Sequence, residues 1–165
     1  ALLRGTQIGA RAGAALGAGA PPLALLDANA TAFDLEATIS LPADGAAAAF
    51  GVWALGEVVG NALFQMNVSV SAAGANGRTA RVVGMATSGF NPPKPFKVDY
   101  SFALPAPADT LELRLLADTT VVEAYVAGGR AVLSNGPFVA HSPLWGQAWL
   151  ASSGAARVDA RAWAM

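Results

Sequence analysis

Residues 33–39 read FDLEATI, a stretch in which apolar side chains occupy every odd position and polar side chains every even one. Residues 96–102, FKVDYSF, repeat this alternation, and residues 62–70, ALFQMNVSV, follow it with one exception at Leu63. A period of two predicts β-strands that bury one face in a core and expose the other face to water.

Seven further β-rich runs flank these stretches, and Pro, Gly, Asn and Asp separate many of them. They cover residues 50–55, 79–85, 111–116, 121–126, 131–134, 147–151 and 158–163. About ten short strands with no helical period between them predict an all-β fold. We expect a two-sheet antiparallel β-sandwich of the jelly-roll or concanavalin-like type, with a closed barrel as the alternative.

Two connections are distinctive. Gly128-Gly129 separates two β-rich runs and predicts a tight hairpin turn, because such turns require positive φ. Residues 84–95 are the most loop-like part of the chain.

The 165 residues suit one domain of ordinary size. Residues 1–22 are expected to form a linker and a flexible Gly/Ala-rich N-terminal segment, and residues 23–165 the β-sandwich. Residues 10–20, ARAGAALGAGA, could alternatively belong to a targeting peptide, but no continuous apolar region accompanies them.

Composition excludes several classes of protein. The formal net charge is −1, and the ten Lys and Arg residues are scattered, so no nucleic-acid footprint is present. No apolar run approaches the ~20 residues that span a bilayer, so we expect no membrane insertion. The absence of Cys excludes disulfides and thiolate ligands. We expect no metal site and no cofactor.

Few residues could carry out catalysis. His141 is the only histidine, so neither a two-histidine metal site nor a His-paired relay has a second member. Asp118 and Glu123 are the nearest approach to a carboxylate pair, which could hydrolyse a glycosidic bond if ~5–10 Å apart. Their spacing does not fix that geometry. The favoured interpretation is that Asp118 forms a turn and that Glu123 is hydrogen-bonded to neighbouring backbone.

The tryptophans and two sequons are candidate surface features. Trp53 and Trp163 fall within strand patterns and are expected to pack in the core or on a sheet. Trp145 and Trp149 flank a Gly-Gln turn and are the candidates for a sugar-binding or partner-binding surface, although packing is the favoured role. Asn29 and Asn67 begin N-x-S/T triplets and are candidate N-glycosylation sites.

Residues 111–133, LELRLLADTTVVEAYVAGGRAVL, resemble a signature of the C-terminal β-sandwich module of glycoside hydrolase family 32, the family of invertases and fructan hydrolases. Residues 2–5 (LLRG) are similar to the linker that leaves this family's catalytic propeller. Residues 33–39, 49–53 and 158–165 resemble its early and terminal strands. The resemblance implies that the family's motif has a structural role, and its members in this chain are Asp118, Val122, Glu123, Gly128, Gly129 and Arg130.

The resemblance implies a function without catalysis. In this family the catalytic Asp and Glu residues lie in a five-bladed propeller, and their W-x-N-D-P-N-G, R-D-P and E-C motifs do not occur in this chain. Asp118 and Glu123 therefore inherit no catalytic role. Thr119 replaces the usual basic residue of the motif, and Thr120 replaces the usual Ser, which puts any polar contact of the basic residue in doubt.

The expected function is that of an accessory module that packs on and stabilises a catalytic propeller. The alternative is a stand-alone structural or carbohydrate-binding (lectin-like) subunit. The implied partner is a propeller or another subunit, with carbohydrate as a further candidate ligand, and the resemblance favours a secretory or extracellular location.

One strand suggests where a partner docks. Residues 121–126 (VVEAYV) have apolar side chains at both odd and even positions, which predicts a strand covered on both faces. This interpretation places Val122 on the outer, docking face. Alternatively, a loop of the same chain covers a central strand.

Overall fold

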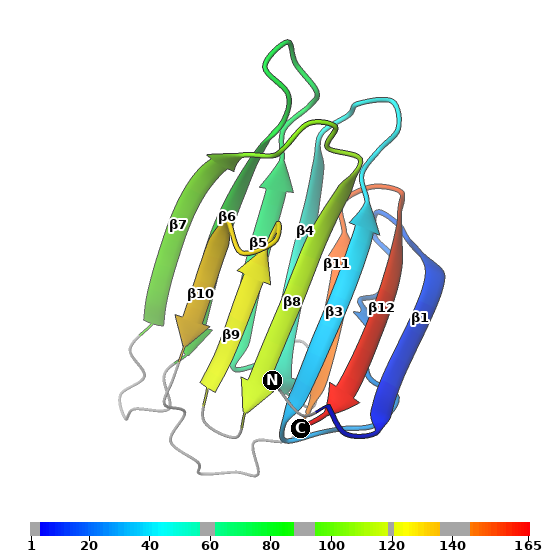
Figure 1. Ribbon diagram of the computed structural model, residues 1–165, viewed down its shortest axis with the longest axis vertical. Helices are drawn as coiled ribbons and strands as arrows, with labels where there is room; N and C mark the ends of the chain where they lie inside the picture. Colours follow the sequence, from blue (N-terminus) through cyan, green and yellow to red (C-terminus); the bar gives the residue numbers. More distant parts are fainter. Residues whose placement is uncertain (1–3, 57–61, 88–94, 119–120, 136–145) are drawn as a thin grey trace.

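In a computed structural model of the chain, two antiparallel sheets of six strands each pack face to face (Figure 1). The structure describes residues 4–56, 62–87, 95–118, 121–135 and 146–165. Sheet A has the order β1-β12-β3-β8-β9-β10 and sheet B the order β2-β11-β4-β5-β6-β7. The strands are β1 (Gln7–Leu16), β2 (Leu23–Ala24), β3 (Phe33–Ser40), β4 (Ala48–Gly56), β5 (Phe64–Val70), β6 (Thr79–Thr87), β7 (Pro95–Ala103), β8 (Thr110–Asp118), β9 (Val121–Val126), β10 (Ala131–Asn135), β11 (Gln147–Ser152) and β12 (Ala156–Ala164).

This architecture confirms the predicted antiparallel sandwich, and the alternative of a closed barrel is wrong because the strands form two separate sheets. No helix occurs in the ranges that the structure describes. Within those ranges, accordingly, no helix has the length and apolar character needed to cross a membrane.

The core lies between the sheets and is built by the alternation seen in the sequence. In β3, Phe33, Leu35 and Ile39 are at most 1% exposed. The register pairs Leu35 with Leu115 and Ile39 with Leu111, so the apolar faces of β3 and β8 coincide. A one-residue slip would turn every one of these side chains to the solvent, and the core therefore fixes the register.

The N-terminal segment differs from the prediction. Residues Gln7–Leu16 form β1, which pairs with β12 along most of its length, whereas a flexible segment was expected over residues 1–22. The sequence gives little sign of this strand, because residues 7–16 (QIGARAGAAL) are mostly Ala and Gly and show no regular contrast between apolar and polar positions. Two register shifts, between Gln7 and Gly9 and between Arg11 and Ala14, further break the period of two.

The prediction for Val122 is also wrong. Val122 is fully buried and pairs with the core residue Ala117 of β8, so its side chain faces sheet B. The outward positions of β9 are Val121, Glu123 and Tyr125, none of which is fully buried. Odd and even positions of this strand are both apolar in the sequence because the outward face carries a valine and an aromatic ring.

The Gly128-Gly129 hairpin turn is confirmed. It joins β9 to β10, and both glycines have positive φ, of 67° and 88°. Part of the loop predicted over residues 84–95 is strand, because β6 continues to Thr87 and β7 begins at Pro95. The remainder lies outside the described residues.

Candidate functional site

Asp34 lies on the outer face of sheet A, where alternation along β3 directs its side chain away from the core. Its side chain is nevertheless 0% exposed, because two arginines cover it. Arg114 donates from Nε and Nη2 to the two carboxylate oxygens, each at 2.9 Å, and Arg4 donates from Nε to Oδ2 at 2.7 Å. Asp34 thus connects β3, β8 and the N-terminal segment.

Arg4 precedes β1 and is fixed to this face at several points. Besides Asp34, its guanidinium contacts the Glu36 carboxylate and lies 4.0 Å from the centroid of the Trp163 ring, a cation–π arrangement. The amide of Gly5 donates to the carbonyl of Ala164 at 2.8 Å. The segment that enters the sandwich is therefore held against the outer face of sheet A.

The electrostatics of the cluster stabilise its charged form. Burial would raise the pKa of Asp34, but hydrogen bonds from Arg114 and Arg4 outweigh it and hold the pKa below its usual value. The hydrogen bond to Asp34 raises the pKa of Arg114. Asp34 is consequently ionised at neutral pH.

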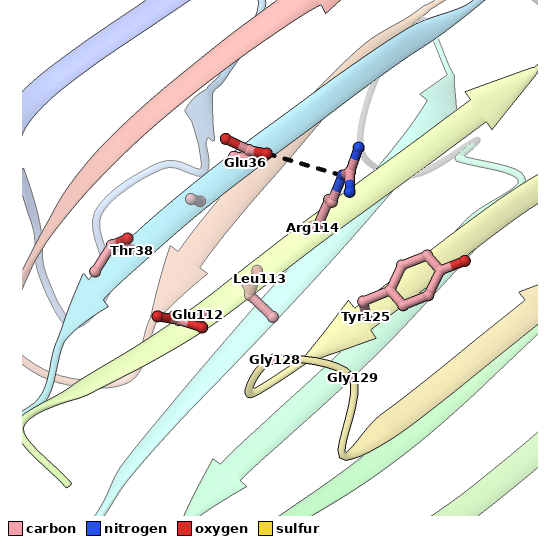
Figure 2. A pocket seen from close by; sticks show the side chains of 9 residues that line it. Glu36, Thr38, Glu112, Leu113, Arg114, Tyr125, Gly128 and Gly129 are labelled. Carbon is pink, nitrogen blue, oxygen red and sulfur yellow. Dashed lines mark ion pairs between the residues drawn. The ribbon is translucent and has the colours of Figure 1, made fainter. Parts of the chain in front are cut away.

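A groove of about 460 Å³ borders the cluster on the same face (Figure 2). Glu36, Arg114 and Tyr125 form one row across β3, β8 and β9, because the register places them opposite one another. The Nε atom of Arg114 lies 3.9 Å from Oε1 of Glu36. Other lining residues include Thr38, Glu112, Leu113, Gly128 and Gly129.

The groove has a fixed wall. The Ala127 amide donates to the Glu112 carbonyl at 2.8 Å and attaches the β9–β10 turn to β8. The Tyr125 hydroxyl donates to Oε2 of Glu123 at 3.0 Å, and this hydrogen bond raises the pKa of Tyr125. The surface therefore offers a positioned aromatic ring between charged groups.

The Asp34 carboxylate is not available as a proton donor. The most perturbed carboxylate, Asp34, is ionised and saturated by two guanidinium groups, so it cannot serve as a general acid at neutral pH. No group of three or more His, Cys, Asp or Glu side chains that could hold a metal occurs among the described residues.

The structure separates the residues of the predicted motif. Gly128 and Gly129 line the groove, whereas Glu123 faces outward beside it and binds Tyr125. Asp118 is exposed at the end of β8, and Arg130 is exposed in the turn. Asp118 and Glu123 are diagonal neighbours on the outer face, since they lie opposite Val121 and Leu116.

The other candidates lie elsewhere. Trp149 is 8% exposed and pairs with Trp53 and Ala24 on sheet B, so it offers little surface to a sugar or partner. Asn29 and Asn67 are both exposed. Trp145 and His141 lie outside the described residues.

Sequence reasoning did not identify the central cluster of Arg4, Asp34, Glu36, Arg114 and Trp163. Alternation predicts Asp34 as a solvent-facing residue, and the sequence carries no signal that two arginines cover it. The register of β12, β3 and β8 brings Asp34, Glu36, Arg114 and Trp163 together, and the segment before β1 adds Arg4.

The sequence model of the family described as "Glycosyl hydrolases family 32 C terminal" matches residues 6–163 of the chain. No curated protein matches the sequence closely enough to count as a relative.

Several solved structures resemble the chain. Fructan 1-exohydrolase IIa from Cichorium intybus is 16% identical with a TM-score of 0.75, over 99% of this chain and 36% of that one. Exo-inulinase from Aspergillus awamori is 17% identical with a TM-score of 0.62, over 96% of this chain and 29% of that one. Sucrose-6-phosphate hydrolase from Lactobacillus gasseri is 14% identical with a TM-score of 0.55, over 94% and 28%. At these identities the likeness shows the fold alone, and the chain spans about a third of the length of these proteins.

Proposed function

Because this chain belongs to the glycosyl hydrolase family 32 C-terminal domains, we propose that it is a non-catalytic accessory module that packs against a catalytic propeller through the outer face of sheet A. Its role is to support the propeller rather than to cleave a glycosidic bond.

The attachment of Arg4 carries this proposal. Residues 2–5 resemble the linker that leaves the propeller in this family, and Arg4 is fixed to Asp34, Glu36 and Trp163 on sheet A. A linker held at this point brings the preceding module to the same face. Arg4 pairs with the buried carboxylate of Asp34 as well as with the more exposed one of Glu36, and this fixes the direction in which the linker leaves the sheet.

The character of the face supports the same conclusion. Interfaces are enriched in aromatic residues and Arg, and here Tyr125, Trp163, Arg4 and Arg114 lie on one surface. The groove beside Tyr125 can receive side chains of a partner. We expect a stable contact of ~1,000 Å² or more.

Binding of two separately produced modules tests the proposal. The sandwich is mixed with the propeller encoded in the same gene, and association is measured by titration calorimetry. Thr38→Arg places a long cation in the groove of sheet A and should weaken binding at least about tenfold. Thr79→Arg makes the same change at an exposed position of sheet B and should leave binding unchanged.

Weakening by Thr79→Arg but not by Thr38→Arg would assign docking to sheet B. A gene that encodes no propeller would refute the accessory role.

A second candidate function, sugar binding without a propeller, is favoured by the lining of the groove. Tyr125 offers a ring on which a sugar can stack, and Glu36, Glu112 and Arg114 offer hydrogen bonds to hydroxyl groups. Titration of the isolated sandwich with inulin and levan oligosaccharides separates the two functions, because saturable binding abolished by Tyr125→Ala would support the second.

A further inference from the structure

Trp53 has an unusual position on the outer face of sheet B. A Cβ atom added to Gly51 would lie 2.3 Å from Cη2 of Trp53, 2.8 Å from Cζ3 and 3.0 Å from Cζ2. The six-membered ring therefore lies along β4, over the backbone of Gly51, in the space that a side chain would fill. Glycine at position 51 permits this arrangement, and Trp53 is only partly buried.

Asn67 lies directly beside this ring. The register of β4 and β5 places Asn67 opposite Gly51, and side chains at opposite positions are about 5 Å apart. Trp53, Gly51 and Asn67 line one hollow of about 300 Å³, which has room for a sugar ring. Its other lining residues include the small side chains of Ala49, Ser69 and Ala151 and the larger ones of Arg81 and Val83.

Asn67 also begins the triplet Asn67-Val68-Ser69. Asn67 and Ser69 are both exposed on the outer face, whereas Val68 is fully buried in the core. Strand alternation thus presents both recognition groups of the triplet on the side where the Trp53 ring lies. The sequon and the aromatic ring are two independent features of one site.

We propose that Asn67 carries an N-linked glycan whose first N-acetylglucosamine packs against the indole of Trp53. In the transfer step, Nδ2 of Asn67 attacks the anomeric carbon of an oligosaccharide activated as its polyprenyl pyrophosphate. The N–C bond forms, the bond from that carbon to the pyrophosphate oxygen breaks, Nδ2 loses one proton to a base of the transferase, and the lipid pyrophosphate leaves.

The position of β5 sets the timing of this step. β5 is an interior strand of sheet B, hydrogen-bonded to β4 and β6 on its two sides. A transferase needs the triplet free of such pairing, so modification precedes the folding of sheet B. Once the sheet has formed, the apolar face of the sugar ring covers the indole and shields it from water.

The chain is tested by production in a eukaryotic secretory host behind a heterologous signal peptide. We expect mass spectrometry of glycopeptides to find Asn67 occupied and Asn67→Gln to lose one glycan. Protein trimmed by an endoglycosidase to a single N-acetylglucosamine should melt about 2–4 °C above Asn67→Gln. This difference should vanish in a Trp53→Leu background, since the sugar then has no ring to cover.

Asn29 provides the matched control, because it begins the other sequon and lies in a connecting segment outside the strands. A glycan at Asn29 should show no dependence of the Tm on Trp53. If Trp53→Leu does not fold, nuclear magnetic resonance of the wild-type glycoprotein supplies the test: the protons of the sugar at Asn67, and not at Asn29, should shift upfield through the indole ring current. An unoccupied Asn67, a melting difference that persists in Trp53→Leu, or unshifted sugar protons would overturn the proposal.

Discussion

Asp34 and Arg114 form a bidentate ion pair across β3 and β8, with both N–O distances at 2.9 Å. The two residues are diagonal neighbours, since Asp34 lies opposite Leu116 and Arg114 opposite Glu36. Arg4 completes the coordination of the carboxylate. Through Arg4, this buried carboxylate attaches the segment before β1 to the sheet on which we propose that a propeller docks.

Asp34→Ala should lower the free energy of unfolding by about 2–3 kcal/mol, because it removes the charge-assisted hydrogen bonds from Arg4 and Arg114, whose side chains are 34% and 36% exposed and stay partly solvated. Chemical denaturation measures the change. Asp99→Ala is the matched control: the ion pair of Asp99 with Arg81 is 39% and 58% exposed, so its loss should cost about 1 kcal/mol or less. Equal losses in the two variants would contradict a special role for Asp34.

The contribution of Asp34 to the free energy of unfolding should depend on pH. Its folded pKa is lowered, so the contribution is complete above the unfolded pKa of about 3.9 and is lost as the pH falls through the folded pKa. Urea unfolding of the wild type and of Asp34→Asn should therefore give curves that converge at low pH. A constant difference between them from neutral pH down to about pH 2 would be the contrary result.

Val122→Lys should destabilise the sandwich by more than about 4 kcal/mol or unfold it, because Val122 is fully buried and a lysine there has no partner for its charge. Val121→Lys, one residue earlier and on the outer face, should cost less than about 1 kcal/mol. Thermal melts of the two variants decide between the faces, and a tolerated lysine at position 122 would place the core on the other side of β9.

The isolated chain should release no fructose from sucrose, inulin or levan above buffer, because it lacks the propeller motifs and its buried carboxylate is held ionised. A reducing-sugar assay checks this, with Glu123→Gln as the control. Reproducible hydrolysis that disappears in Glu123→Gln would show a catalytic role for Glu123 and refute the accessory function.

Strands with a strong contrast between neighbouring positions were predictable. The alternation in residues 33–39 and 96–102 falls within β3 and β7, because burying one face of a sheet requires that contrast. β1 escaped prediction, since its Ala and Gly residues bury little apolar area and its two register shifts break the period. For Trp149 the predicted strand over residues 147–151 and the favoured packing role agree with its place within β11, where it is almost fully buried, whereas the surface role suggested by the neighbouring Gly-Gln turn does not.

The sequence by itself determined the class of fold, the Gly128-Gly129 turn and the membership of the family, because these depend on local periodicity, backbone conformation and motif order. Only the tertiary structure decided which side of β9 is the core, why Asp34 is buried and that Trp53 lies beside Asn67. All three facts depend on strand register: that of β8 with β9, that of β4 with β5, and that of β12, β3 and β8, which lie far apart in the chain. That register follows from packing the two sheets together, and no single segment of the sequence specifies it.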